Sequence, residues 1–577
     1  MNAGDRRIKD IFNGARILEI PFFQRAYVWG EEQWERMLED MENVSSKNKP
    51  YFLGSVILKQ HDTSTNGGIG DVRTVIDGQQ RLTTLNILFK VFCLKANKDH
   101  LFNNAFKILV DDIPPSYEIS LRHNHNDIES FNKILELSEL EDLEEDNNKI
   151  FAAYNHFKKN LKPDKIDFNK ILANLLFVVI DLNENEDEQQ IFDTINSLGV
   201  RLTTAELLKN YFFHRNIDLY DKFWKNIFEK DEETKNYWDR EITAGRSKRT
   251  IIDLFFFSYL QIKIQEKNLD VKTEDKIEFS KVEQLFESYK KFIKKYLGDD
   301  KNSILTEIKD YAFIFRENFD CDIVGKELTN NAGIERINAI IFGLENSTLI
   351  PYVLYILKNV GKDSNINDLF EIIETFIMRR MVIRDTTKNY NQFFTDRLIN
   401  NEILSKNDFV KYLEGQSDKV NSLPSDEQLK NGFNDSHLIN KQAKGILYFI
   451  ESKLRNKEKY STELKGLDQY SLEHLMPKKW ENNWGKLSSQ EETNERNHRL
   501  LTLGNLAIIT QPLNSSIRDA DWKTKKEGKG GKKEGLNKYA SGLETLSTFL
   551  DSEEWNEKEI KNRAKFLFER AKDIWKI

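Results

Sequence analysis

The sequence predicts a helix-rich, multidomain α+β protein, and three observations lead to that fold class. The chain has 577 residues, of which 39% are hydrophobic, enough for about three or four domains with a buried core each. Its first part alternates short strand-like and helical runs, and residues 217–413 have helical spacing with few prolines or glycines. We therefore expect a small α/β domain with a helical extension at residues 1–216, a helical connecting domain at 217–430 and a last domain at 431–577.

The N-terminal domain is predicted to contain three strands followed by a helix. The strand-like runs are RILEIPFF, YFLGSVILKQ and VRTVID, and the amphipathic run LTTLNILFKVFCL predicts the helix. The loop from His61 to Asp71 is rich in turn-forming residues, which indicates a hairpin or a mobile flap. Between Glu129 and His214 the pattern is mainly helical, with one strand-like run, FVVIDL, and an acidic stretch, ELSELEDLEEDNN, expected as a solvated helix end or loop.

The C-terminal domain is predicted to have the order strand, strand, helix. After a polar passage from Glu414 to Ser436, expected as a linker or surface excursion, an apolar segment carries Glu473 and His474 before Pro477 breaks it. A second strand surrounds Asn505, and Asn514 opens a loop before a basic helix.

Charge and cysteine content exclude several protein classes. The 94 acidic side chains outnumber the 86 basic ones, for a formal charge of −8, so the chain is not a general polycation. Two cysteines cannot make a disulfide framework or a cysteine-based zinc site, which fits a reducing cytosol. The N-terminal residues are polar and lack the apolar core of a signal peptide, and the longest apolar runs are too short to cross a bilayer. We expect a soluble, cytoplasmic protein with no membrane partner.

The residues around His474 suit phosphodiester hydrolysis. A histidine acting as general base, near oxygen ligands that hold one divalent cation, can activate water while the metal stabilises the leaving oxygen. Carboxylate and amide oxygens are ligands that Mg²⁺ accepts readily. The alternative is that His474 is an ordinary histidine beside a turn.

A basic segment follows Asn514 in this acidic protein. It contains Arg518, Lys523, Lys525 and Lys526 and continues as a Lys/Gly run to Lys538. A local positive patch beside catalytic residues is where a DNA backbone would lie, although the same composition also suits a solvated linker. The string GKGGKK is not a phosphate-binding P-loop, because no Ser or Thr follows the lysine.

Two N-terminal strings combine aromatic, amide and cationic side chains. In IPFFQRAYVWGEEQW the relevant residues are Phe23, Gln24, Arg25, Tyr27 and Trp29. Such groups can stack on bases or hydrogen-bond to base edges and phosphates, although Tyr27 and Trp29 alone are more often core residues.

In the second string, TVIDGQQRLTTL, a strand ends in a tight turn and Arg81 begins a helix, a geometry suited to phosphate. The tetrapeptide RLTT recurs at Arg201, and both copies are either anion sites or ordinary helix caps.

Taken together, these motifs resemble the GmrSD-type restriction endonucleases. The strings Pro-x-x-Gln-Arg-x-Tyr-x-Trp, Asp-Gly-Gln-Gln-Arg and DEQQIFDTINSLGVRLTTAELLKN are similar to the ParB-like N-terminal domain of that family. Glu-His-x-x-Pro, Leu-Gly-Asn-Leu and the following Asn resemble its C-terminal His-Asn-His, or ββα-metal, nuclease domain. The middle part lacks a sharp signature, although IMRRMVIRDTTKNYNQFF resembles the family's usual Arg-Arg segment.

The resemblance implies a role for each motif residue. In the nuclease domain it implies His474 as general base, Glu473 and Asn514 as metal ligands, and Asn505 as the residue that pins the loop orienting the histidine. In the N-terminal domain it implies that nucleotide phosphates and a cation are bound by Asp77, Gly78, Gln79, Gln80 and Arg81, with Asn196, Lys209 and Asn210 completing the pocket. The two RLTT helix starts would then face one ligand. Relatives often carry Tyr where this chain has Phe23, so a hydrogen bond from that hydroxyl is absent here.

The function implied by the resemblance is an NTP-regulated, modification-dependent DNA endonuclease of prokaryotic anti-phage defence. Its cofactors would be Mg²⁺ or another divalent cation and an NTP, with GTP, ATP, CTP and UTP not distinguished. Its partner would be modified phage or foreign DNA. A single nuclease site cuts one strand at a time, so double-strand cleavage would need a homo-oligomer or two successive binding events. Two alternatives stay open: a nucleotide-regulated ParB-like DNA-binding regulator with an inactive nuclease end, and an RNA-cleaving abortive-infection effector.

Overall fold

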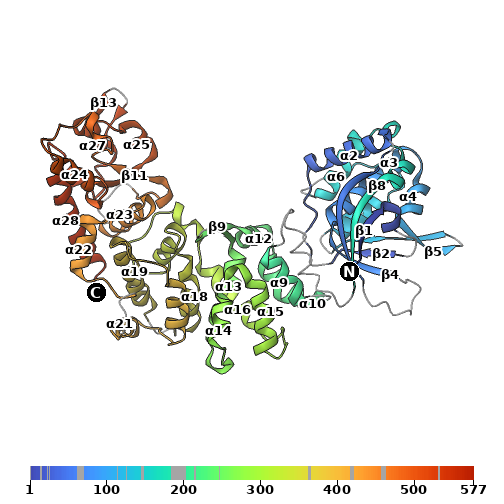
Figure 1. The fold of residues 1–577 in the computed structure, drawn as a ribbon, viewed down its shortest axis with the longest axis horizontal. Coiled ribbons are helices and arrows are strands. Elements are labelled where there is room, and N and C mark those ends of the chain that lie inside the picture. The colour runs from blue at the N-terminus through green and yellow to red at the C-terminus, as the bar shows by residue number, and fades with distance from the viewer. Residues whose placement is uncertain are drawn as a thin grey trace. The chain divides into compact units, whose positions relative to one another are not determined.

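The protein consists of two compact units, residues 1–220 and residues 221–577 (Figure 1). The computed structural model describes residues 2–12, 16–21, 24, 26–47, 49–60, 71–112, 115–124, 127–144, 148–183, 203–213, 216–245, 247–361, 365–415, 421–455, 463–530 and 533–577. The boundary between the units lies after residue 220, and residues 221–577 form a single unit, so the division expected after residue 430 stays a prediction. No helix within the described ranges has both the length and the apolar character needed to cross a membrane.

A six-stranded mixed sheet forms the centre of the first unit. Its strand order is β1 (Asn2–Arg7), β8 (Leu175–Leu182), β3 (Tyr51–Gln60), β4 (Asp71–Asp77), β2 (Arg16–Glu19) and β7 (Leu121–Arg122). β8 is parallel to β3, and β2 is parallel to β4 and β7, whereas β1 pairs with β8, and β3 with β4, in antiparallel fashion. A separate hairpin joins β5 (Lys107–Asp112) to β6 (Pro115–Ile119).

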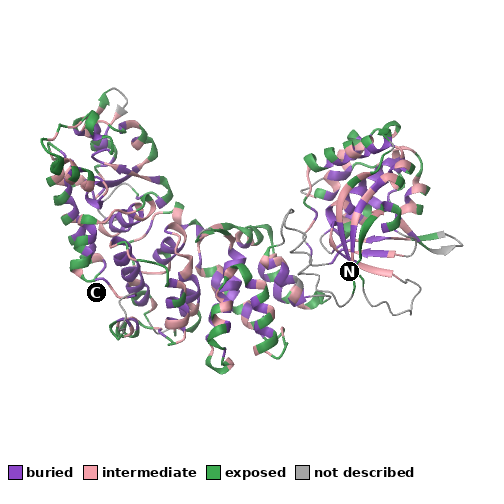
Figure 2. Ribbon diagram, viewed as in Figure 1, coloured by how far each residue is buried: buried purple, intermediate pink, exposed green. Residues whose placement is uncertain are grey.

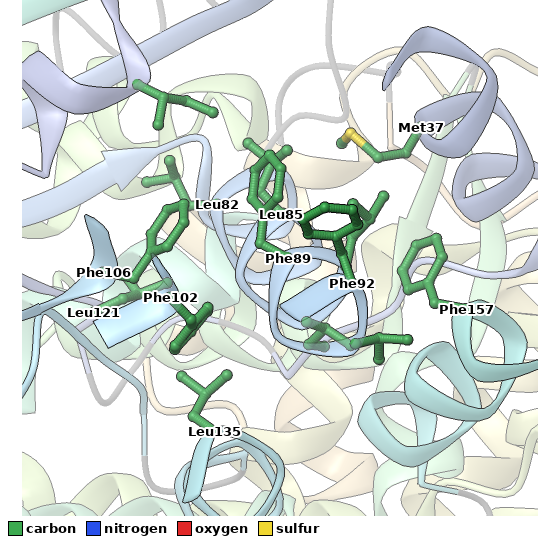
Figure 3. Close-up of a cluster of buried hydrophobic side chains, with 14 of the residues drawn as sticks. Met37, Leu82, Leu85, Phe89, Phe92, Phe102, Phe106, Leu121, Leu135 and Phe157 are labelled. Carbon is green, nitrogen blue, oxygen red and sulfur yellow. The ribbon is translucent and has the colours of Figure 1, made fainter. Parts of the chain in front are cut away.

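Helices pack on the sheet of the first unit around one large apolar core. They are α1 (Ile8–Ile11), α2 (Glu31–Lys47), α3 (Gln79–Lys95), α4 (Asp99–Phe106), α5 (Ile128–Glu136), α6 (Lys149–Asn160) and α7 (Phe168–Asn174). The helices α9 (Thr204–Phe213) and α10 (Ile217–Tyr220), which contact each other, are the last elements of the unit. α3 is buried along nearly its whole length, because apolar residues occupy all of its faces. Figure 3 shows Phe89 and Phe92 of α3 surrounded by side chains from neighbouring elements, including Met37, Phe106 and Phe157.

The second unit begins with helices, and its buried residues concentrate on the facing sides of those helices (Figure 2). In chain order the elements are α11 (Asn226–Phe228), α12 (Glu232–Asp239), β9 (Glu241–Ala244), β10 (Ser247–Thr250), α13 (Ile251–Lys263), α14 (Thr273–Phe279), α15 (Leu285–Tyr296), α16 (Leu305–Asn318), α17 (Ile334–Asn338), α18 (Ile350–Asn359), α19 (Ile366–Val382), α20 (Tyr390–Gln392), α21 (Lys406–Glu414), α22 (Asp426–Asp435) and α23 (Asn440–Leu454). α13 is its most buried helix, since the run IIDLFFFSYLQI is enclosed on all sides.

The C-terminal part of this unit carries a two-stranded sheet and a long final helix. Its elements are β11 (Tyr470–His474), α24 (Gln490–Arg499), β12 (Leu506–Thr510), α25 (Gln511–Ile517), α26 (Trp522–Glu527), β13 (Gly528–Gly530), β14 (Lys533–Glu534), α27 (Leu536–Tyr539) and α28 (Glu557–Ile574). A buried polar cluster fixes the end of α28 to α19. The Trp575 indole donates to the Glu374 carboxylate at 3.1 Å, and the Arg379 guanidinium donates to the Trp575 carbonyl at 2.7 Å. Arg336 holds the same carboxylate from the other side through two hydrogen bonds, of 2.6 and 2.8 Å.

The strands and helices predicted for the first unit are confirmed, but β5, β6 and β7 were not predicted, and three further features of the chain differ from prediction. β2, β3, β4, α3 and β8 occupy the predicted runs, and the acidic stretch is irregular where the structure describes it. The polar edge strand β1 and the hairpin β9–β10 were not predicted, because neither has an alternating apolar pattern. The linker interpretation of Glu414–Ser436 is wrong for its second half, where a capping box formed by Ser425 and Gln428 starts α22.

Candidate active site

Strands β11 and β12 and helix α25 position the C-terminal candidate residues. β11 pairs antiparallel with β12, so that Glu473 lies opposite Ala507 and His474 opposite Leu506. α25 follows β12 without a gap, with a proline in its first turn. Successive strand residues point to opposite faces, and accordingly Glu473 is buried while His474 is half-buried.

His474 is a neutral imidazole at neutral pH. Burial lowers the pKa of His474 to about 4, and the nearby ammonium groups of Lys478 and Lys525 act in the same direction. Within the described part of the chain, its ring makes no hydrogen bond. A neutral, half-exposed imidazole can accept a proton from water, which is what a general base must do.

Asn505 fixes the turn that follows His474. Its Oδ1 accepts hydrogen bonds from the Met476 amide at 2.8 Å and the Trp555 indole at 3.0 Å. Its Nδ2 donates to the carbonyls of Met476 at 2.8 Å and Leu500 at 3.0 Å. Asn505 is fully buried, so each of these bonds satisfies a group that water cannot reach. The hydrogen bonds of Asn505 therefore fix the backbone after His474 to the 503–505 turn.

Helix α28 packs against the 503–505 turn and stabilises it. The fully buried Arg563 donates through Nη1 to the carbonyls of Gly504 at 2.9 Å and Leu506 at 2.7 Å. A Cβ on Gly504 would lie 2.2 Å from the Ile560 carbonyl oxygen, so only glycine allows α28 to approach this closely. Burial lowers the pKa of Arg563 to about 9.

Glu473 is held by a lysine that sequence reasoning placed on the surface. The Lys525 ammonium donates to Glu473 Oε1 and, at 2.8 Å, to the His474 carbonyl oxygen. Its side chain is 0% exposed, so Lys525 is not part of the DNA-facing patch in which the sequence places it. Burial raises the pKa of Glu473, and the Lys525 charge opposes that rise. Lys525 lies three residues after the buried Trp522 in α26, so both side chains lie on the same face of the helix. This spacing could have predicted that Lys525 is buried.

Asn514 lies on the same side of β11 as Glu473. Its Nδ2 donates to Ser471 Oγ at 3.0 Å and to the Leu472 carbonyl at 3.1 Å. In the described ranges, no group of three or more His, Cys, Asp or Glu side chains could hold a metal ion. A carboxylate and an amide oxygen fit a hard cation that keeps several waters, such as Mg²⁺.

The remaining basic candidates differ in exposure. Lys523 is exposed, whereas Lys526 donates to the Ser552 carbonyl at 2.7 Å and lies over the Trp522 ring. Arg518 is exposed and has a φ of 38°, a backbone conformation that is unusual for any residue except glycine. It follows directly on α25, the helix that carries Asn514.

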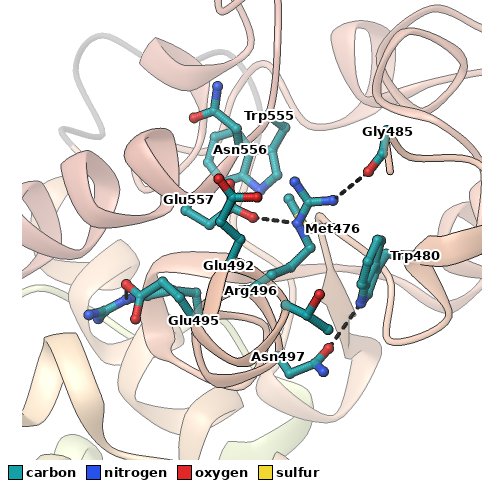
Figure 4. A network of polar contacts seen from close by, with 12 residues as sticks. Met476, Trp480, Gly485, Glu492, Glu495, Arg496, Asn497, Trp555, Asn556 and Glu557 are labelled. Carbon is teal, nitrogen blue, oxygen red and sulfur yellow. Dashed lines mark hydrogen bonds and ion pairs between the residues drawn. The ribbon is translucent and has the colours of Figure 1, made fainter. Parts of the chain in front are cut away.

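A second polar network ties the segment after Pro477 to α24 and α28 (Figure 4). Arg496 pairs with Glu557, donates to the Gly485 carbonyl at 3.0 Å and stacks over the Trp480 ring. The Trp480 indole donates to Asn497 at 3.0 Å. The ring of His498 hydrogen-bonds to Asp435 at 3.3 Å. His498 therefore belongs neither to the network around Asn505 nor to the network around Arg496.

In the first unit, the two N-terminal strings are bonded to each other. Gln80 Oε1 accepts from the amides of Val28 at 3.0 Å and Trp29 at 3.4 Å. The Tyr27 hydroxyl lies 2.6 Å from Thr84 Oγ1, and Tyr27 is 3% exposed, so its ring packs in the core. Gln24 is also buried, and its Nε2 donates to the Val75 carbonyl at 2.7 Å.

Asp77, Gly78 and Arg81 form a tight turn beside strand β3. Gly78 has a φ of 99°, and a Cβ there would lie 2.9 Å from the Val56 side chain. Arg81 Nη2 donates to the Ser55 carbonyl at 2.7 Å and to Asp77 Oδ2 at 3.2 Å. Its guanidinium rests against Gly54, where a Cβ would be 3.4 Å away.

One pocket of about 290 Å³ joins the two strings. Trp29 of the first string and Arg81 of the second line it together with Arg36 and Tyr51. Aromatic faces and guanidinium groups in one cavity match the chemistry of a nucleotide, whose base stacks and whose phosphate is anionic. Burial raises the pKa of Tyr51 to about 12, and its hydroxyl donates to Asp40 at 2.6 Å.

The other N-terminal candidates are only partly described. Phe23, Arg25, Asn196 and Arg201 lie outside the described residues, and so does the side chain of Asn210. Lys209 is a buried residue of α9, and Gln79 is a buried residue at the start of α3.

Comparison with known proteins gives two matches along the chain. Residues 8–213 match the model for "GmrSD restriction endonuclease, N-terminal domain", and residues 423–570 match the model for "GmrSD restriction endonucleases, C-terminal domain". The first match runs from α1 to α9 and leaves out β1, and the second contains every C-terminal candidate residue. No curated protein matches the chain.

Proposed function

The chain belongs to the GmrSD family of restriction endonucleases, and on that premise we propose that it is an NTP-regulated endonuclease that cuts modified DNA by a one-metal His-Asn-His mechanism. A restriction endonuclease acts on DNA. The observation that carries the catalytic part of the proposal is the neutral His474, which follows Glu473 in β11 and precedes a turn held by the buried Asn505.

Each residue has a distinct task in this mechanism. A ring nitrogen of His474 takes a proton from the water that attacks the scissile phosphorus. Asn505 keeps the backbone at Met476 in place, so that the imidazole does not drift from the phosphate. Glu473 and Asn514 would supply oxygen ligands to Mg²⁺. A divalent cation bound there would stabilise the charge that develops on the leaving oxygen.

The exposed basic side chains at the edge of this site would bind the DNA backbone. Arg518 and Lys523 are exposed close to α25, and Lys526 is half-buried. Phosphate contacts of this kind contribute affinity without reading sequence, so their loss should weaken binding equally on all substrates.

The N-terminal pocket supports the regulatory part of the proposal. Because Trp29 and Arg81 line one cavity, the string assigned to recognition and the string assigned to nucleotide phosphates would serve the same ligand. We propose that this ligand is a nucleotide, either a free NTP or a modified nucleotide of the DNA. Lys209, Asn196 and Asn210 would complete the nucleotide site from the helical side.

The catalytic proposal is tested by comparing the protein with a His474→Ala variant. The substrates are unmodified, hydroxymethylated, glucosylated and phosphorothioated plasmids, with Mg²⁺ and with or without each of the four NTPs. We expect one modified plasmid to be cut and the cutting to disappear in the variant. Intact DNA on every substrate, with NTP still bound, would favour the ParB-like regulator, and cleavage of RNA alone would favour the RNA-cleaving effector.

The regulatory proposal is tested by nucleotide binding to Arg81→Ala and Arg201→Ala variants. Both should bind NTP more weakly, while an Arg122→Ala control, which removes a half-exposed arginine paired with Glu118, should bind normally. Normal binding by the Arg201 variant would refute the idea that both RLTT helix starts face one ligand.

A further inference from the structure

Lys525 is a fully buried cation in the C-terminal part of the chain. It lies in α26 with its side chain 0% exposed. Its neighbours Lys523 and Lys526 reach the surface at least in part, so Lys525 alone of these three is enclosed. Burying an ammonium is costly unless it is paired and hydrogen-bonded, and Lys525 meets both conditions.

The two partners of Lys525 are the two residues on which the proposed reaction depends. Its ammonium donates to Glu473 Oε1 and, at 2.8 Å, to the carbonyl oxygen of His474. One buried cation therefore links the side chain of the proposed metal ligand to the backbone of the proposed general base. A divalent cation on Glu473 and the Lys525 ammonium would compete for the same carboxylate charge.

We propose that Lys525 is a positioning residue that serves as the resident counter-ion of Glu473, and that a divalent cation binds by taking over this carboxylate from it. The bond from Lys525 to the His474 carbonyl keeps the ammonium partnered when the carboxylate turns to the metal. Lys525 thus holds the site in shape before the cation arrives and lowers the affinity with which the cation binds. This inference rests on the proposed nuclease function.

The test measures Mn²⁺ binding and thermal unfolding in the full-length protein. A Lys525→Gln variant keeps a hydrogen-bond donor but loses the charge. Without metal it should unfold at a lower temperature than the wild type, because Glu473 is left as an uncompensated buried charge. Its Mn²⁺ affinity should rise about tenfold, since one positive charge near the dication has been removed. Its melting temperature should accordingly gain more from Mn²⁺ than that of the wild type.

Two controls separate this effect from general charge or packing changes. Lys558→Met removes an equal charge from an exposed position of α28 and should leave Mn²⁺ affinity unchanged. The double variant Glu473→Gln, Lys525→Gln should lose the gain in affinity, because the carboxylate itself is gone. If Lys525→Gln does not fold, Lys525→Met, which keeps the length of the side chain, is measured in its place.

A destabilised Lys525 variant whose Mn²⁺ affinity is unchanged or weaker would overturn the inference, because Lys525 would then have a packing role alone. That result differs from failure of the proposed function. In the latter case the wild-type protein itself would neither bind Mn²⁺ nor cut any DNA.

Discussion

Replacing Asn505 with alanine tests whether this side chain supports the catalytic strand. The substitution removes four buried hydrogen bonds, those to the Met476 amide and carbonyl, the Leu500 carbonyl and the Trp555 indole. At about 1 kcal/mol for each bond, the expected loss in the free energy of unfolding is about 4 kcal/mol. We expect DNA cleavage to fall as well, because the backbone after His474 loses its support.

Urea unfolding followed by tryptophan fluorescence measures this loss directly, because the Trp555 indole lies 3.0 Å from Asn505 Oδ1. The matched control is Asn497→Ala, which removes a single hydrogen bond, from the Trp480 indole, and should cost about 1 kcal/mol. Equal losses in the two variants would refute the idea that Asn505 is the central support of the turn.

Three further predictions concern other buried positions. Burial lowers the pKa of His123 to about 4 against an ordinary value of 6.5, so the unfolded chain binds more protons between these values. The first unit should therefore have its full stability above pH 6.5 and lose up to about 3 kcal/mol as the pH falls to 4, and a His123→Gln variant should flatten this dependence in acid unfolding. A Gly504→Ala variant places a methyl 2.2 Å from the Ile560 carbonyl, and calorimetry should show a loss of about 3 kcal/mol. Tyr27→Phe removes the buried hydroxyl beside Thr84 and should destabilise the first unit by about 2 kcal/mol in urea, with a smaller loss indicating that the bond contributes little.

The sequence is most informative where a strand or helix is buried on a regular pattern. The runs that become β3, β4 and β8 are rich in Val, Ile and Leu, and they lie inside the sheet of the first unit. The edge strand β1 has no such pattern, because it pairs through its backbone while its side chains stay largely exposed. A strand that pairs through its backbone at a sheet edge does not need an alternating pattern of apolar side chains, so side-chain periodicity does not predict it.

The candidate sites show the same limit. The strand, strand, helix order around His474 can be predicted, because Pro477 and the apolar run of β12 delimit the elements. The burial of Lys525 cannot be predicted from the KTKKEGKGGKK run, since its composition is that of a solvated segment. Nor does the sequence indicate that Gln80 and Thr84 hold the string around Tyr27, because these contacts join residues more than fifty positions apart.

The dependence of the 503–505 turn on α28 has a consequence for the nascent protein. Ribosomes add about 5 to 20 residues per second, and domains fold as their segments emerge. Arg563 is made 89 residues after His474 (563 − 474), which corresponds to a delay of about 4 to 18 seconds. Until Trp555 and then Arg563 have been made, the turn lacks the indole that bonds Asn505 and the guanidinium that bonds its carbonyls. A chain still being synthesised therefore carries His474 before a turn that lacks these contacts, and under the proposed mechanism we expect DNA cleavage only after α28 has been made.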